Sequence, residues 1–162
     1  MTAIALLLAL AALLAWALWA NKALVLTEYT AAPEGLPQAF DGFKIAQVSD
    51  LHNASFGEGN GKLLSLLREA DPDIIAVTGD LVDSRRTDVD SAAAFIEAAA
   101  EIAPVYYVTG NHEARLDFAD IERRLLDAGA AVLRGEAVYI ERGGERIRLA
   151  GIDDPAFAGA DG

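Results

Sequence analysis

Three polar residues lie along the chain at intervals close to the length of one βαβ unit. Of all the features of the sequence, this spacing constrains the fold most strongly. Asp50, Asp80 and Asn111 lie 30 and 31 residues apart, and each follows an apolar run. Continuous apolar runs of this kind are typical of strands that are buried on both faces. The stretches between them have helical periodicity. Strands that alternate with helices predict an α/β protein with a parallel sheet and right-handed crossovers.

The expected strands and helices alternate from residue 43 onward. Strands are predicted at 43–49, 73–80, 104–113 and 131–133, and helices at 62–70, 88–103 and 117–129. Asp117 is the expected N-cap of the last helix, and Gly129 its C-terminal stop. A hairpin over 137–152 is expected to turn at Gly143-Gly144. The segment 24–30 could add a first strand.

The N-terminal 21 residues carry no charged side chain. Ala3–Ala20 would span about 27 Å as a helix, close to the thickness of a bilayer core. Trp16 and Trp19 lie where an interfacial belt would fall. We interpret this run as a single transmembrane anchor. A signal peptide is an alternative, although no basic residue precedes the run, and a buried core helix is another.

Three segments follow from this pattern: an anchor at 1–22, a connector at 23–42, and one α/β domain at 43–162. Lys22 alone does not settle which side of the membrane the domain faces. The rest of the chain carries the whole net charge of −12, which argues against binding to nucleic acid. The chain has no cysteine, so disulfides and thiolate chemistry are excluded. The sequence does not indicate an oligomeric state.

The polar residues that follow the strands are expected to meet in space. In an open parallel sheet, ligands bind beyond the carboxyl ends of the strands. This places Asp50, His52, Asp80, Asn111 and His112 around one crevice, and these two histidines are the only ones in the chain. Carboxylate and imidazole together suit first-row divalent ions, since magnesium and calcium prefer oxygen ligands alone. We therefore expect a metal site at this edge.

Asp80, in the central segment, is the natural candidate for a carboxylate that bridges two ions. Two ions about 3.5–4 Å apart can clamp a phosphoryl group and activate a water. Gly79 and Gly110 precede the ligands, and their lack of a Cβ permits a sharp turn and close backbone approach to a ligand. Each short motif also has an ordinary reading, such as a helix cap or a turn, but their joint occurrence favours the metal site. A receiver-like signalling domain would have no use for the two histidines.

The motifs D-x-H at Asp50 and His52, GD at Gly79-Asp80 and GNHE at 110–113 resemble those of the calcineurin-like metallophosphoesterases. The phrases "LPQAFDGFKIAQVSDLHN", "GDLVDSR" and "LAGIDDP" look like a membrane-associated branch that includes bacterial UDP-2,3-diacylglucosamine pyrophosphatase-like enzymes. The resemblance covers residues 24–155. It implies the N-terminal half of an α/β/β/α sandwich, here preceded by one transmembrane helix.

The resemblance also implies a role for each strand-end residue. Asp50, His52 and Asp80 would hold a first divalent ion, and Asp80 and Asn111 a second, with manganese, iron or zinc as the metals. His112 would contact the phosphate and protonate the leaving group.

Four further acids are weighed beside these residues. Glu113 or Asp83 could orient His112, although for Asp83 we favour a helix cap or a solvated acid. We interpret Asp153 and Asp154 as part of a turn before Pro155.

Members of the family that this chain resembles continue to Gly-His and Gly-His-x-His motifs, whereas this chain has no histidine after His112. The sequence is therefore expected to be C-terminally incomplete, and full activity of the 162 residues alone is not expected. The hypothesis is a membrane-anchored phosphoesterase that acts on a phosphorylated small molecule or a lipid-linked substrate. The alternatives left open are a natural short protein with a degenerate site, and a non-catalytic tethered module that binds a metal or phosphate.

Overall fold

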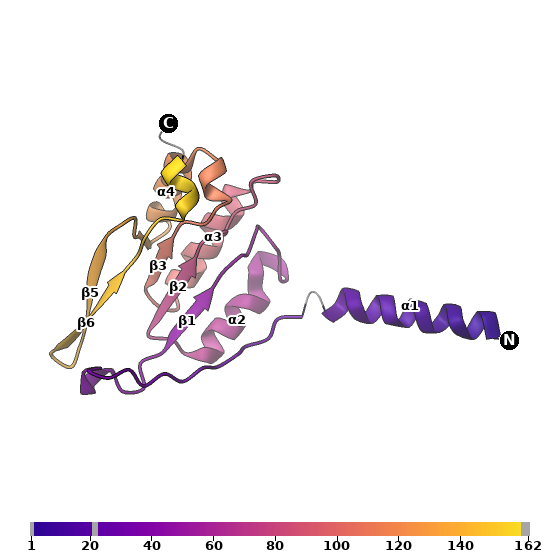
Figure 1. Cartoon of the computed structure of the whole chain (residues 1–162), viewed down its shortest axis with the longest axis horizontal. Coiled ribbons are helices and arrows are strands. Elements are labelled where there is room, and N and C mark those ends of the chain that lie inside the picture. Colours follow the sequence, from indigo (N-terminus) through magenta and orange to yellow (C-terminus); the bar gives the residue numbers. More distant parts are fainter. Residues whose placement is uncertain (1, 21–22, 160–162) are drawn as a thin grey trace.

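A parallel four-stranded sheet forms the centre of the protein (Figure 1). The computed structural model describes residues 2–20 and 23–159. The strands are β1 (Ile45–Val48), β2 (Ile74–Thr78), β3 (Val105–Val108) and β4 (Ala130–Val132), and they lie in the order β1-β2-β3-β4. All three pairings are parallel. The predicted α/β alternation and parallel sheet are confirmed.

Three helices connect these strands: α2 (Gly61–Ala70), α3 (Val89–Ala100) and α4 (Phe118–Asp127). Because the strand order follows the chain order, right-handed crossovers place the three helices on one face of the sheet. Their apolar stripes meet the strands in a core that includes Ile75, Phe95 and Leu125, all of which are at most 1% exposed. Short 3-10 helices lie at Gln38–Phe40, Glu58–Asn60, Glu113–Arg115 and Pro155–Gly159.

The helix ends agree with the predicted caps in position. Asp88 precedes α3, and its side chain accepts a hydrogen bond from the Ser91 N–H at 2.9 Å. Asp117 occupies the N-cap position of α4 without a side-chain hydrogen bond to the helix. Gly129 follows α4 with φ of +97°, a left-handed conformation that glycine adopts readily.

The hairpin forms a separate two-stranded antiparallel sheet (Figure 1). Its strands are β5 (Ala137–Arg142) and β6 (Glu145–Ala150), and they turn at Gly143-Gly144 as predicted. Just after β6, Gly151 lies so close to the sheet that a Cβ there would overlap Leu133 and Val108. The complete α/β/β/α sandwich stays a prediction.

The N-terminal segments depart from the sequence interpretation. Helix α1 (Thr2–Ala20) forms, but its large side chains from Ile4 to Trp16 are 58–73% exposed, which excludes a buried core helix. In the described part of the chain, no helix has the length and apolar character to cross a membrane, so the transmembrane anchor at 1–22 is not supported. Residues 1, 21–22 and 160–162 of the predicted segments lie outside the described residues. The possible strand at 24–30 is wrong: this exposed stretch has no strand.

Candidate metal centre

The loops that follow β1 and β2 continue side by side beyond the sheet. The Asp50 N–H donates to the Gly79 carbonyl at 3.2 Å, and the His52 N–H donates to the Asp80 carbonyl at 2.9 Å. The parallel pairing therefore extends past the last strand residues. This extension places Asp50 and His52 next to Asp80, as the strand-end argument predicted.

The loops after β2 and β3 meet through two glycines. Gly79 has φ of +83°, and a Cβ there would lie 2.7 Å from the Cα of Gly110. A Cβ on Gly110 would overlap the carboxylate of Asp80. These glycines permit a close approach of the two loops, whereas their predicted close approach to a ligand stays a prediction. Space requires glycine at both positions, and the positive φ adds a conformational reason at Gly79.

Several non-glycine residues of the site adopt a left-handed backbone conformation. Asp50, His52 and Asp80 have φ of 55°, 48° and 51°. A left-handed residue with a Cβ costs on the order of 1 kcal/mol, and such residues concentrate at functional sites. The surrounding hydrogen bonds hold this backbone in place, which favours a site in which these side chains are aimed at a common point.

Asp80 presents its two carboxylate oxygens to two different loops. Its Oδ1 accepts the His112 N–H at 2.8 Å, and its Oδ2 lies 3.7 Å from Nε2 of His52. The residue is only 7% exposed. Oδ2 therefore lies beside a possible metal ligand, and the hydrogen bond to Oδ1 fixes the orientation of the carboxylate.

His52 points its Nε2 atom between two acids. This atom lies 3.7 Å from Oδ1 of Asp50 and 3.7 Å from Oδ2 of Asp80. The other ring nitrogen, Nδ1, is buried and has no hydrogen-bond partner among the described residues. Asp50 also accepts a hydrogen bond from the Ser49 hydroxyl at 2.6 Å. Two carboxylates around an imidazole nitrogen form a donor set that fits a divalent transition-metal ion.

His112 is held from behind by the loop that follows β2. Its Nδ1 accepts the Ser84 N–H at 3.1 Å, and the Ser84 hydroxyl lies 3.3 Å away. Because a backbone N–H can only donate, the neutral ring carries its hydrogen on Nε2. The ring centroids of His112 and His52 are 4.4 Å apart. His112 therefore lies beside His52 at the candidate metal centre, and its Nε2–H is a donor available to face a substrate.

Asp83 faces His112, contrary to the helix cap or solvated acid that we favoured. Its Oδ1 lies 3.7 Å from Nδ1 of His112, and the cap of α3 is Asp88 instead. The Arg85 N–H, which donates to Asp83 at 2.8 Å, lowers the pKa of this carboxyl, and the nearby histidines lower it further. Asp83 is thus the acid beside His112.

Glu113, the other acid considered for that place, lies elsewhere. Its side chain is fully buried, and each oxygen accepts two backbone hydrogen bonds. The four donors are the N–H groups of Asp80, Leu81, Val82 and Gly110, at 2.8–3.2 Å. Glu113 therefore joins the loops after β2 and β3. The sequence interpretation placed Glu113 beside the His112 ring because the two residues are adjacent in the chain. Adjacent residues in a turn point in different directions, so this inference failed.

One compact group of possible ligand atoms stands out at this edge. His52, Asp80 and His112 each offer one atom, and these atoms lie within 4.8 Å of one another. The group includes His112, which the sequence interpretation treats as a proton donor. Asn111 lies half-buried between Gly110 and His112.

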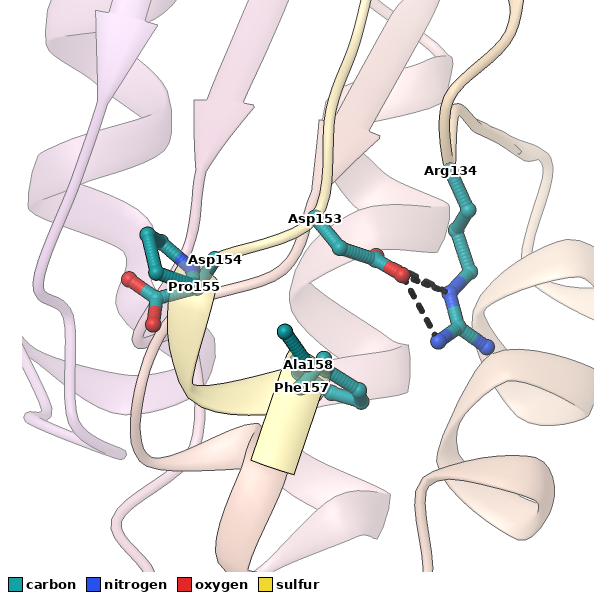
Figure 2. Close-up of a pocket in the computed structure, with 6 residues that line it drawn as sticks. All are labelled: Arg134, Asp153, Asp154, Pro155, Phe157 and Ala158. Atoms are coloured by element: carbon teal, nitrogen blue, oxygen red, sulfur yellow. Dashed lines mark hydrogen bonds and ion pairs between the residues drawn. The ribbon is translucent and has the colours of Figure 1, made fainter. Parts of the chain in front are cut away.

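A second cluster of charged side chains supports the loop after β3 from behind. Figure 2 shows the Asp153 carboxylate directed at the Arg134 guanidinium, with which it makes hydrogen bonds at 2.8–3.0 Å. Asp153 also accepts the hydroxyl hydrogen of buried Thr109, which precedes Gly110. The interpretation of Asp153 as part of a turn is therefore incomplete, whereas Asp154 does form a turn by accepting the Ala156 N–H at 2.8 Å. The pocket beside this cluster is lined by Arg134, whose charge is already paired with Asp153, and neither histidine lines it.

Comparison with known proteins agrees with this geometry. A model of the calcineurin-like phosphoesterase family matches residues 43–154. The uncharacterized metallophosphoesterase YkoQ of Bacillus subtilis is 34% identical over 75% of this chain and 46% of its own length. An uncharacterized metallophosphoesterase of Aquifex aeolicus is 34% identical over 78% of this chain and 48% of its own length.

The transmembrane protein with metallophosphoesterase domain of Danio rerio is also similar, with 32% identity over 75% of this chain and 29% of its own length. The chain spans half the length or less of these curated relatives. The family match extends from the segment before β1 to the Asp153-Asp154 turn, so it includes all the loops described above. The chain belongs to the calcineurin-like phosphoesterase family.

Proposed function

We propose that the protein is a metal-dependent phosphoesterase that hydrolyses a phosphomonoester, a phosphodiester or a pyrophosphate. The observation that carries the proposal is the Asp80 carboxylate, whose two oxygens face His52 and the backbone of His112. The compact group of His52, Asp80 and His112 supports a metal site around this carboxylate, and the resemblance of the motifs to the family favours two ions there. Membership of the phosphoesterase family supports the reaction class.

The proposed first ion is held by Asp50, His52 and Asp80, and the proposed second by Asp80 and Asn111. Manganese, iron and zinc all suit this mixture of carboxylate, imidazole and amide ligands. Bound ions of this kind supply Lewis-acid stabilisation of phosphoryl charge and lower the pKa of a coordinated water. The protein residues contribute the fixed orientation of the ligands, which the glycine contacts and the loop hydrogen bonds maintain.

The proposed catalytic residue is His112. Its Nδ1 is occupied by the Ser84 N–H, so its Nε2–H is free to contact a phosphoryl oxygen or the oxygen of the leaving group. Asp83, 3.7 Å from Nδ1, stabilises positive charge on the ring. We propose that the neutral His112 ring donates an Nε2–H hydrogen bond to the phosphate. The imidazolium form, with its Nδ1–H paired with Asp83 instead of the Ser84 N–H, would give its Nε2 proton to the leaving group and return to the neutral ring.

The finer proposals concern the substrate and the location. The sequence resemblance favours a membrane-associated branch that acts on lipid-linked pyrophosphates. We propose that α1 attaches the protein to a membrane, because its apolar side chains are exposed and two relatives, of Danio rerio and Bos taurus, are named transmembrane proteins. Removal of residues 1–22 should move the protein from the membrane fraction to the soluble fraction. Recovery of the intact chain in the soluble fraction would contradict this proposal.

The reaction class is tested by metal-dependent hydrolysis. The chain, supplied with Mn²⁺ or Zn²⁺, is assayed with p-nitrophenyl phosphate, bis-p-nitrophenyl phosphate and a nucleoside diphosphate sugar. We expect slow hydrolysis that a chelator abolishes and that the Asp80→Asn variant lacks. Metal binding without any turnover above that variant would instead favour the non-catalytic binding module.

A further inference from the structure

Asn53, the residue after His52, ties the loop after β1 to both ends of the next loop. Its backbone N–H donates to the Leu81 carbonyl at 3.0 Å. Its side-chain Oδ1 accepts the N–H of Asp83 at 2.9 Å and the N–H of Asp88 at 3.2 Å. Its Nδ2 donates to the Asp88 carbonyl at 2.7 Å. One amide side chain thus fixes the start and the end of the segment 83–88.

The segment 83–88 is also the part of the protein that holds the His112 ring. The Ser84 N–H binds Nδ1 of His112 at 3.1 Å, and Asp83 lies 3.7 Å from the same atom. Inside the segment, Asp83 accepts the Arg85 N–H with its side chain and the Thr87 hydroxyl with its carbonyl. The orientation of His112 therefore depends on where this segment is held, and Asn53 holds both of its ends.

We propose that Asn53 is a positioning residue for His112. Two features of asparagine suit this place. It tolerates the left-handed backbone that position 53 adopts, with φ of 54°. Its amide also combines the acceptor that binds two N–H groups with the donor that binds a carbonyl. Any consequence for catalysis rests on the proposed function, but the positioning itself requires neither metal nor substrate.

The test compares Asn53→Gly with a matched control, Asn60→Gly. Asn60 has a similar φ of 59° and accepts the Phe56 N–H with its Oδ1 at 2.9 Å. Glycine adopts positive φ without strain, so each variant loses side-chain hydrogen bonds and gains no backbone strain. The two variants differ in whether the lost bonds hold the segment 83–88.

The readout is NMR of the 162-residue chain in the presence of a chelator. In the wild type, we expect a scalar coupling across the hydrogen bond from the Ser84 nitrogen to Nδ1 of His112. In Asn53→Gly this coupling should disappear, and amide hydrogen exchange of Ser84 should accelerate by roughly tenfold or more as the segment opens locally. Asn60→Gly should keep both signals. An unchanged Ser84 coupling in Asn53→Gly would overturn the proposal.

A second variant covers the case in which Asn53→Gly does not fold. Asn53→Asp keeps the acceptor oxygen for the N–H groups of Asp83 and Asp88, and replaces the donor to the Asp88 carbonyl by an oxygen that the carbonyl repels. The contact that holds Asp83 is kept, so the Ser84 coupling should be retained. Its loss in a folded Asn53→Asp protein would contradict the proposal. In an active enzyme, Asn53→Gly should lower kcat for an alkyl phosphate more than for p-nitrophenyl phosphate, with unchanged metal content. A chain that hydrolyses nothing would defeat the proposed function and leave the NMR result intact.

Discussion

Asp80 and Asp50 are proposed ligands of the same ion, yet the protein holds them very differently. The side chain of Asp80 is 10% exposed, whereas that of Asp50 is 67% exposed. We call Asp80, Gly110 and Glu113 the inner half of the site, and Asp50 with His52 the outer half. In the inner half, the backbone of both loops is bonded to the buried Glu113 carboxylate. In the outer half, the only side-chain hydrogen bond to Asp50 comes, among the described residues, from its neighbour Ser49.

This difference indicates how the site is built. The inner half is fixed by the fold, because its hydrogen bonds join two loops that follow neighbouring strands. The outer half has its backbone fixed, but its ligand atoms lie 3.7 Å apart, and the Asp50 side chain is exposed and that of His52 partly exposed, so an ion would complete it. We therefore expect changes in the inner half to affect folding and metal together, and changes in the outer half to affect mainly metal affinity.

His112 is the side chain that belongs to neither half, and its substitution has the largest expected effect. As a proton donor that binds no metal, His112→Asn should leave metal content unchanged in the active protein. It should lower kcat by about 10²–10⁴-fold, the usual range for a positioned general acid. The measurement is steady-state kinetics together with metal analysis of the purified variant.

The compact group of His52, Asp80 and His112 supplies the competing expectation. If His112 is a ligand, His112→Asn should lose metal as well as activity. A smaller kcat loss with p-nitrophenyl phosphate than with an alkyl phosphate supports the proton-donor role, because the nitrophenolate hardly needs protonation. An unchanged kcat would contradict both roles.

The comparison of the two halves is tested directly by Asp80→Asn and Asp50→Asn. Asparagine keeps the size of each side chain and removes its charge. Asp80→Asn should weaken metal binding by more than the roughly 10–100-fold typical of outer-shell residues, because it removes a bridging ligand. Asp50→Asn should weaken it less, since water can replace an exposed ligand. Calorimetric titration with Mn²⁺ or Zn²⁺ measures the metal affinity of both variants. Equal losses of affinity would show that the inner and outer halves do not differ in metal binding.

The role of Glu113 is tested by its amide variant. In Glu113→Gln, an NH₂ group replaces one oxygen and faces backbone N–H donors, so buried donors lose their acceptor. We expect the free energy of unfolding to fall by about 2–4 kcal/mol. Glu97→Gln, at an exposed position of α3, is the matched control and should change stability by less than about 0.5 kcal/mol. Urea denaturation measures both, and similar values would show that the four hydrogen bonds contribute little.

The sequence predicted the fold well because its signals are local. Apolar runs that end in Asp50, Asp80 and Asn111 at a constant spacing determine the βαβ alternation, and parallel strands bring their carboxyl ends to one edge. Short-range rules also predicted the Gly143-Gly144 turn. The possible strand at 24–30 failed because strand propensity is not enough, and that stretch has no partner strand in the described structure.

The supporting contacts of the site could not be predicted from local signals. Glu113 receives hydrogen bonds from residues about 31–33 positions away, and Asn53 from residues 30 and 35 positions away. An acid that binds backbone N–H groups has no periodicity and no fixed spacing. The pairing of Asp83 with His112 depends on the path of the segment 83–88, which turns back toward the ring.

The smallest expected effect lies behind the inner half, in the Arg134–Asp153 pair. The Arg134 guanidinium, and next the Thr109 hydroxyl, lower the pKa of the Asp153 carboxyl. In the unfolded chain this pKa is about 3.9, so the pair stabilises the fold fully above about pH 4. That contribution is lost as the pH falls through the lower pKa of the folded state. Because both side chains are partly exposed, it should reach about 1 kcal/mol or less.

A double-mutant cycle of Asp153→Asn and Arg134→Met isolates this coupling energy from the packing of Arg134 against Phe118 and Phe157. Measured by urea denaturation, the coupling should be present at pH 7 and should decrease steadily below pH 4. A coupling energy that is constant from pH 7 to pH 2 would show that the charge of Asp153 does not matter to the fold. Because Thr109 connects this pair to Gly110, weakening it should also lower metal affinity slightly, and less than Asp50→Asn does. A larger loss of metal affinity than that of Asp50→Asn would mean that metal binding depends more on this support than on the exposed ligand Asp50.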